Sequence, residues 1–228
     1  MRSEMIIFAY TLKQKIMADN YLGKKMEDLE RRKKVVKARS NVKSLDTLLL
    51  RNRSCRGWDT SVKVTEENLR KIVTVNTMIP SAKNQQVLRF KFLTGKKAAD
   101  FCQFIKLGAL LPELTLPPKG MEPSAFIIIC STIPENKWVD MDLGIAAQSM
   151  LLKAVEMGLT GICIGAFNKA EAQKLVPEGL DPVLVIALGK GAEKYQILHI
   201  AENENHNYFR ENGIHYIPKV RIEDLIIK

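Results

Sequence analysis

Two continuous apolar runs, AFIIIC at 125–130 and VLVIAL at 183–188, constrain the fold of this chain more than any other feature. Each has the length of a buried strand and falls well short of the ~20 apolar residues that a membrane span requires. Helical patterns interleave with these runs, the longest from Asp140 to Gly158, where a glycine is a natural terminator. The strands are too few for a regular βαβ repeat. The pattern predicts an α+β domain with three layers and no membrane partner.

Shorter segments complete the predicted elements. Thr65, followed by two acids, predicts the start of a helix that stops before Pro80, because a residue preceding proline disfavours helix. Residues 89–95 alternate like a half-buried strand, and residues 98–111 have a helical pattern. From Glu193 onward the tail has no strong pattern until HYIPKVRIEDLIIK at 215–228, so the sequence predicts little of the structure before that point.

The net charge of +10 is concentrated near the N-terminus. Residues 1–43 hold 12 Lys or Arg against 5 Asp or Glu, which leaves +3 for the rest. In MEDLERRKKVVKARS the acids precede the bases, which favours a solvated helix over a polyanion-binding arm, since no aromatic residue interleaves with the cations. We therefore expect a basic, helical extension at 1–43, a domain at 44–228 and no nucleic-acid partner. The first residues resemble a secretory signal only weakly, and Met17 is an equally good start.

Cysteine, histidine and acidic residues predict no metal site and no catalytic side chain. The four cysteines are scattered without a CxxC, which favours a reducing, cytoplasmic location, and Cys130 and Cys163 are expected to be small buried hydrophobes. Asp140 and Asp142 are interpreted as helix-start acids. Surface or loop positions are expected for the three histidines, His199, His206 and His215.

Three polar clusters remain, and no glycine-rich phosphate cradle of the GxGxxG or GxxxxGK[ST] type accompanies them. RNRSCRGW, at 51–58, offers guanidinium forks and a hydroxyl that suit a phosphate, although cations ending a helix explain it equally well. PSAKNQQVLRF, at 80–90, carries amides that donate and accept at once, as a heteroaromatic ring requires, although a capped turn explains half of it. Lys219 and Arg221 either close on the same anion or form a solvated strand edge.

In this order, the clusters resemble the FMN-dependent nitroreductase family. The first two clusters match the family's N-terminal signatures, and a third match lies in DLGIAAQSMLLKAVEMGLTGICIG. The matching residues are Arg53, Ser54, Arg56 and Trp58; Pro80, Ser81, Ala82, Asn84, Gln86 and Phe90; Asp142, Gly144, Ala146, Gln148, Gly158, Leu159, Ile164 and Gly165; and Lys219 and Arg221. Asn52, Val87 and Leu88 depart from the family pattern, and the segment between Phe90 and Ala125 is short.

The resemblance implies a homodimer in which a central mixed, mainly antiparallel sheet is flanked by helices, with FMN at the subunit interface. It assigns the FMN phosphate to Arg53, Ser54, Lys219 and Arg221, and the pyrimidine edge of the flavin to Arg56. Ile164 and Gly165 would bring a backbone N–H towards flavin N5. The segment from Pro80 through Ala82 to Gln86 would line the flavin, with Ser81, Asn84 and Gln86 supplied by the partner subunit.

The implied activity is ping-pong hydride transfer from NADH or NADPH through FMN to a small-molecule acceptor such as a nitroaromatic or a quinone. The chemistry would take place on FMN, so the resemblance requires no catalytic side chain. Two alternatives stay open: flavin-dependent dehalogenation or dehydrogenation on the same fold, and a non-catalytic flavin- or nucleotide-binding module.

Overall fold

The computed structural model describes residues 23–30 and 43–227 of the chain. The chain divides into two units at the boundary between Ser44 and Leu45. In the first unit, residues 23–30 form an exposed helix. The remainder of the predicted N-terminal helix, the weak signal-like segment and Met17 lie outside the described residues.

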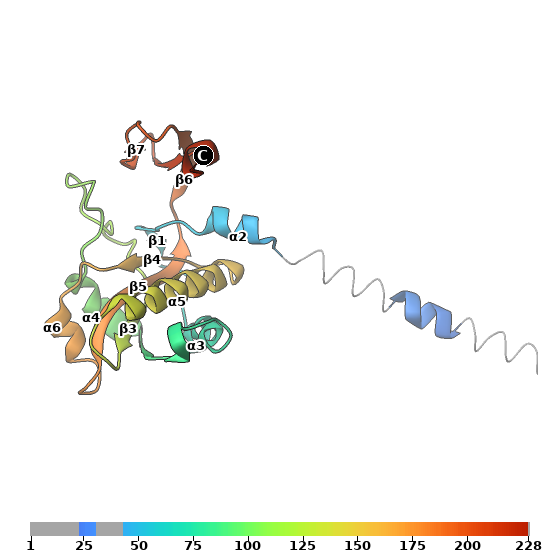
Figure 1. Cartoon of the computed structure of the whole chain (residues 1–228), viewed down its shortest axis with the longest axis horizontal. Coiled ribbons are helices and arrows are strands. Elements are labelled where there is room, and N and C mark those ends of the chain that lie inside the picture. Colours follow the sequence, from blue (N-terminus) through green and yellow to red (C-terminus); the bar gives the residue numbers. More distant parts are fainter. Residues whose placement is uncertain (1–22, 31–42, 228) are drawn as a thin grey trace, which may run out of the picture. The chain divides into compact units, whose positions relative to one another are not determined.

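The second unit is built on a five-stranded sheet whose strands all pair antiparallel (Figure 1). Its order is β1-β5-β3-β2, and β4 pairs with β5. The strands are β1 (Trp58–Asp59), β2 (Leu88–Thr94), β3 (Ala125–Ser131), β4 (Thr160–Ile164) and β5 (Asp181–Gly191). The two apolar runs are therefore the adjacent central strands β3 and β5, as expected of buried strands.

Helices cover both faces of this sheet, which explains why β3 is apolar at every position. Successive side chains of a strand point to opposite faces. Ala125, Ile127 and Ile129 pack in one core with α3 (Glu66–Val73) and α5 (Lys137–Glu156). Phe126, Ile128 and Cys130 pack in a second core with α4 (Gly95–Phe101) and α6 (Lys169–Gln173). The predicted three-layer α+β arrangement is confirmed.

Local capping follows the sequence at both long helices. Thr65 caps α3 through a reciprocal box with Asn68, and a 3₁₀ turn at Thr74–Thr77 follows before Pro80. Asn136 caps α5 by accepting hydrogen bonds from two backbone N–H groups. The helix ends at Glu156, and Gly158 follows with φ of 81°, a conformation that glycine adopts without a steric penalty.

The predicted helix at 98–111 is wrong in its length. α4 ends at Phe101, a 3₁₀ turn follows at Cys102–Phe104, and Ile105 forms an isolated bridge with Phe167. The N–H of Lys106 donates to the carbonyl of Ala166 at 2.8 Å. Here tertiary backbone pairing with the segment after β4 overrides the local helical pattern.

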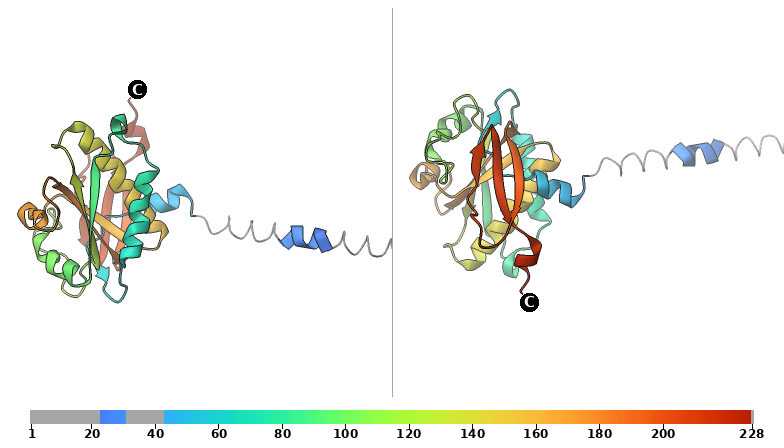
Figure 2. Two further views of the ribbon diagram at one scale, coloured as in Figure 1. Left: turned by 90° about the horizontal axis from the view of Figure 1, so that it is seen from below. Right: turned by 90° about the horizontal axis from the view of Figure 1, so that it is seen from above.

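The weakly patterned tail forms a second sheet beside α2 (Leu45–Arg51), shown in orange to red in Figures 1 and 2. Its strands are β6 (Lys194–Ile200), β7 (Phe209–Glu211) and β8 (Ile214–Val220), in the order β6-β8-β7. β6 and β8 pair parallel and β7 and β8 antiparallel, so the mixed pairing of the fold comes from this sheet. The short helix α7 (Ile222–Leu225) follows.

Candidate functional site

The arginine loop, residues 52–57 between α2 and β1, is held in place by its backbone. The N–H of Cys55 donates to the carbonyl of Gly161 on β4 at 3.2 Å. The N–H of Arg56 donates to the Glu193 carboxylate, at the turn between β5 and β6, at 2.6 Å. Glu193 also accepts from the Arg210 guanidinium. The loop is thus fixed both to the main sheet and to the C-terminal sheet.

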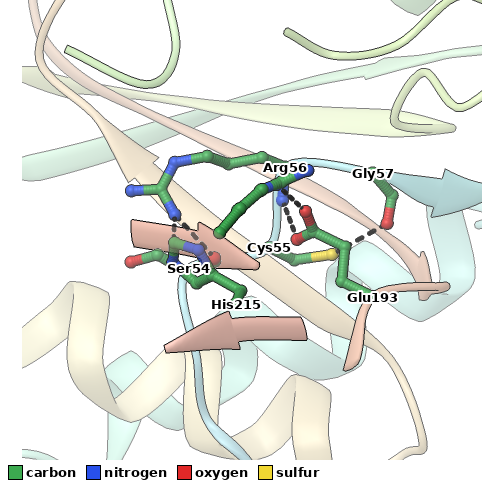
Figure 3. Close-up of polar contacts among 7 residues, drawn as sticks. Ser54, Cys55, Arg56, Gly57, Glu193 and His215 are labelled. Atoms are coloured by element: carbon green, nitrogen blue, oxygen red, sulfur yellow. Dashed lines mark hydrogen bonds and ion pairs between the residues drawn. The ribbon is translucent and has the colours of Figure 1, made fainter. Parts of the chain in front are cut away.

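Arg56 is a buried cation, with 7% of its surface exposed. Its Nη1 donates to the carbonyl of Ser54 at 3.2 Å and lies 3.3 Å from Nε2 of His215 (Figure 3). The Tyr208 ring lies against the guanidinium, with its centroid 4.6 Å from Cζ. Among the described residues no carboxylate pairs with this guanidinium, and its Nε is buried without a hydrogen-bond partner. A buried cation without a counter-charge is costly unless an anionic or electron-rich ligand faces it.

A cavity of 400 Å³ lies between the arginine loop, α5, β4 and β8. It brings together four residues that the resemblance assigned to FMN: Arg53, Ser54, Arg56 and Lys219. Asn52, Gln148, Cys163 and His215 are among the other lining residues. Asn52, which departs from the family pattern, donates a hydrogen bond from its amide to the Gln148 side chain at 3.2 Å.

Arg53 and Arg221 differ from Arg56 in the cavities that they line and in their hydrogen-bond partners. Arg53 also lines a smaller cavity of 150 Å³; its Nη2 donates to the carbonyl of Leu49 at 2.6 Å, and its Nε is buried without a partner among the described residues. Burial lowers the pKa of Arg53, and Tyr195 opposes this shift. Arg221 does not line the 400 Å³ cavity; its Nε donates to Asp224 at 2.9 Å. Of the two C-terminal cations, the structure therefore brings only Lys219 to the arginine loop.

The segment Pro80–Gln86 is folded around the carboxylate of Asp142 on α5. Ser81 Oγ and the N–H of Ala82 each donate to it at 2.7 Å, and the Gln85 amide donates at 3.1 Å. The ammonium of Lys83, in the same segment, lies over the Trp138 ring. Asp142 is 4% exposed, so the interpretation of Asp142 as a helix-start acid is wrong, whereas Asp140 does lie in the first turn.

Three residues of this segment adopt left-handed backbone conformations without being glycine. They are Lys83 and Asn84, each with φ of 53°, and Gln86, with φ of 48°. Such conformations cost about 1 kcal/mol or more each and persist where the surroundings enforce them. The Asp142 carboxylate provides that enforcement. Asn84 and Gln86 are exposed, and the Gln86 amide donates to the Asn84 side-chain oxygen at 3.0 Å.

These amides do not face the arginine loop of their own chain. Pro80, Ser81 and Gln86 line a groove of 530 Å³ between α3 and β2. None of the residues that line this groove lines the 400 Å³ cavity. Ala82 follows Ser81 and begins the 3₁₀ turn that ends at Asn84. Within one chain, the two clusters assigned to the flavin are therefore separate.

At the end of β4, Ile164 is buried in the second core and Gly165 is exposed. A Cβ added at Gly165 would meet no atom within 4 Å, so the backbone here is open to close approach. Cys163, two residues before it, is exposed and lines the 400 Å³ cavity. The expectation that Cys163 is a buried hydrophobe is wrong, because β4 turns this position away from the core, whereas Cys130 is buried as expected.

Sequence reasoning missed His215. It is buried, with 5% of its surface exposed, so its expected surface or loop position is wrong. His215, Ile217 and Lys219 all line the 400 Å³ cavity from β8. Residues i, i+2 and i+4 of a strand share a face. The spacing of His215 from Lys219 was therefore a usable signal, once a strand was assigned here.

Other kinds of site find no support in the described residues. Burial raises the pKa of the Cys55 thiol to about 11, which suits a packed thiol rather than a nucleophile. Over 23–30 and 43–227, no three His, Cys, Asp or Glu side chains gather as metal ligands. No helix in that part of the chain is both long and apolar enough to cross a bilayer.

Comparison with known protein families matches residues 49–190, well over half of the chain, to the nitroreductase family. A curated relative from Archaeoglobus fulgidus, named as an NADH dehydrogenase/NAD(P)H nitroreductase, is 24% identical over 139 residues, which are 56% of this chain and 74% of the relative. The chain belongs to the nitroreductase family. This confirms the resemblance and the enzyme class that it implied, a nitroreductase-like oxidoreductase.

Solved structures agree on the fold. A nitroreductase family protein from Streptococcus pneumoniae superposes with a TM-score of 0.58 at 14% identity, covering 81% of this chain and 100% of that one. Nitroreductases solved in complex with FMN from Exiguobacterium sibiricum and Desulfovibrio desulfuricans each superpose with a TM-score of 0.53, at 19% and 22% identity. Both cover 67% of this chain, and 90% and 88% of their own chains, respectively. The predicted nitroreductase-like fold is confirmed.

Proposed function

We propose that this protein is an FMN-dependent NAD(P)H oxidoreductase that passes a hydride to a nitroaromatic, a quinone or a similar acceptor by a ping-pong reaction. The observation that carries the proposal is Arg56, a buried cation without a carboxylate partner among the described residues, in the wall of a 400 Å³ cavity. The family membership and the FMN complexes of two relatives of the same fold support this choice of ligand.

The donors of the cavity fit FMN. Ser54 and Lys219 offer a hydroxyl and an ammonium to the phosphate, and Arg53 adds a guanidinium whose Nε has no partner in the described chain. Arg56 would face the pyrimidine edge, where a fixed cation stabilises negative charge that develops during hydride transfer. When bound, FMN supplies the hydride acceptor and donor. The open backbone at Gly165 would let an N–H approach the ring.

The second half of the site would come from a partner subunit. The exposed amide of Gln86 and the hydroxyl of Ser81 lie on a different cavity from Arg56, and the exposed Asn84 accepts a hydrogen bond from the Gln86 amide. A homodimer allows the segment of one subunit to face the arginine loop of the other, with FMN between them. In this arrangement the Asp142 carboxylate holds the segment in its strained form and so prepares the partner's flavin site. Arg221, which lies outside the cavity of its own chain, would reach the phosphate only by a rearrangement.

Two alternatives use the same cavity. The flavin of a dehalogenase or dehydrogenase would be bleached by a different electron donor or regain its colour with a different acceptor, and a non-catalytic module would bind flavin without turnover. A cytoplasmic location and the absence of a nucleic-acid partner stay predictions.

The decisive experiment is to purify the protein, add FMN, remove excess and record the visible spectrum. The proposal expects a yellow protein that bleaches when NADH or NADPH is added without oxygen, and that recovers its colour with a nitroaromatic or a quinone. Bleaching without recovery by either acceptor would favour dehalogenation or dehydrogenation. A yellow protein that never bleaches would favour the binding module, and a colourless protein would overturn the proposal.

A further inference from the structure

His215 is in contact with the guanidinium of Arg56. It stands on β8 with its ring centroid 5.2 Å from that of Tyr208, and Nε2 lies 3.3 Å from Nη1 of Arg56 (Figure 3). Tyr208 lies against Arg56 and against His215, so the three side chains pack together. The inference that follows concerns the same site as the proposed function and rests on it.

The contact between Arg56 and His215 fixes the protonation state of the imidazole. A guanidinium only donates hydrogen bonds, so Nε2 of His215 must carry a lone pair to accept one. The proton of the neutral ring is then on Nδ1, which is buried without a hydrogen-bond partner in the described chain. An imidazolium, which donates at both nitrogens, would place two cations and two donors against each other.

The backbone and the guanidinium of Arg56 are held by different groups. Glu193 accepts from the backbone N–H at 2.6 Å, whereas within residues 23–30 and 43–227 the guanidinium contacts only the Ser54 carbonyl, His215 and the Tyr208 ring. The Ser54 carbonyl lies two residues away along the same loop and moves with it. His215 is therefore the acceptor that ties the guanidinium to another part of the fold.

We propose that His215 is a positioning residue, which as a neutral imidazole holds the Arg56 guanidinium in the flavin cavity and which on protonation releases it, so that FMN binds less tightly. His215 acts through Arg56 and supplies no proton to the substrate.

The charged surroundings of His215 agree with this role. Burial lowers the pKa of His215, and Arg56 and Arg210 lower it further, while Glu193 raises it. Arg53, Cys55 and Tyr195 line the small cavity beside the ring, and Lys219 lines the larger one. Cations outnumber the one carboxylate among these groups, so the ring is neutral at neutral pH and gains its proton only below the ordinary histidine range of about 6.5.

The test is a titration of the purified full chain with FMN, followed by quenching of flavin fluorescence, at several pH values between about 5 and 8. Four proteins are compared: the wild type, His215→Gln, His215→Leu and the exposed-histidine control His199→Gln. Glutamine offers an uncharged acceptor that cannot be protonated, and leucine offers none. Ionisation of the FMN phosphate affects all four proteins alike and cancels in their ratios.

We expect His215→Gln to bind FMN within a few-fold of the wild type at pH 8. The ratio of the wild-type Kd to that of His215→Gln should rise as the pH falls below about 6.5. His215→Leu should bind about tenfold more weakly at pH 8, the effect of one charge-assisted hydrogen bond. His199→Gln should follow the wild type throughout.

A constant ratio between the wild type and His215→Gln across the pH range would overturn the inference, as would a His215→Leu protein that folds and binds like the wild type. Circular dichroism and thermal melting report whether the leucine variant folds; if it does not, the glutamine comparison decides alone. Failure of the wild type to bind FMN at any pH would instead refute the proposed function, and the inference with it.

Discussion

Replacing Asp142 with alanine should unfold the domain at a clearly lower temperature. The variant loses three hydrogen bonds to a buried carboxylate, from Ser81, Ala82 and Gln85. Bonds to charged groups contribute about 1.5–3 kcal/mol each when measured singly, and neighbouring bonds are not additive, so we expect a net loss of about 3 kcal/mol. For a domain of this size that corresponds to a fall in Tm of about 6–12 °C.

The same substitution should weaken FMN binding, although Asp142 does not line the flavin cavity of its own chain. Without the carboxylate, the left-handed residues Lys83, Asn84 and Gln86 lose the group that enforces their backbone conformation. The segment would then relax and no longer present its amides to the partner subunit. The wild-type domain should also lose stability in acid by the same route.

The sign of that acid effect follows from the pKa of Asp142. Burial would raise it, but the hydrogen bonds from Ala82, Ser81 and Gln85 outweigh burial and lower it. A carboxylate with a lowered pKa stabilises the fold above its ordinary pKa of about 3.9, and this contribution is lost as the pH falls below that value. The free energy of unfolding should therefore fall less in acid for Asp142→Ala than for the wild type.

Thermal melting followed by circular dichroism at neutral pH and at about pH 2.5, below the ordinary pKa of the carboxyl, measures both effects. Asp140→Ala is the matched control, because Asp140 is exposed and lies on the same helix two residues away. Asp142→Asn keeps one acceptor oxygen and should fall between the wild type and alanine. If Asp142→Ala melts within about 2 °C of Asp140→Ala, or if the Tm of both variants falls equally in acid, the Asp142 carboxylate does not hold the segment Pro80–Gln86 in place.

Three further results are expected. Arg56→Met and Asn84→Ala should each slow turnover about tenfold or more alone, and mixing the two proteins under exchange conditions should restore part of it; no restoration would contradict a shared site. FMN should protect Cys163, which lines the cavity, from alkylation by iodoacetamide at about pH 9, an alkaline pH chosen because burial raises the pKa of this thiol to about 11, as peptide mass spectrometry measures; a thiol that is labelled equally with and without FMN would exclude a flavin there. Gly189→Ala should cost about 1–3 kcal/mol in urea unfolding, because its Cβ would lie 2.7 Å from the Trp58 ring; an unchanged midpoint would contradict this packing.

The sequence predicted the main sheet and its covering helices because their signals are local. Continuous apolar strands and capped amphipathic helices carry their own pattern, and β3, β5 and α5 formed where expected. The helix at 98–111 failed because Ile105 and Lys106 pair with a segment some 60 residues away in sequence, which no local pattern reveals. The C-terminal sheet was missed for the same reason. Its strands β6 and β8 pair parallel although no tight turn connects them, and such pairing leaves no local pattern in the sequence.

The residues of the candidate site could be predicted where they belong to a sequence motif. They could not be predicted where their position depends on contacts between distant segments. Arg53, Ser54, Arg56 and Lys219 do meet at one cavity, whereas Arg221 turns to Asp224. Asp142 looked like a helix-start acid because its three donors come from a segment about 60 residues earlier. His215 gave no motif at all, and its burial depends on strands that the weak pattern of the tail did not reveal.

The central claim is that Arg56 faces a flavin that carries electrons from a nicotinamide to an acceptor. Its most direct test compares two proteins saturated with FMN, the wild type and Arg56→Met. Each is titrated without oxygen with NADH and with NADPH, while the visible absorbance of the flavin is followed. We predict that the wild type bleaches fully with at least one nicotinamide and that Arg56→Met bleaches at least tenfold more slowly, the effect of about 1.4 kcal/mol of lost stabilisation. Equal bleaching rates in the two proteins, or a wild type that stays yellow with both nicotinamides, would contradict it.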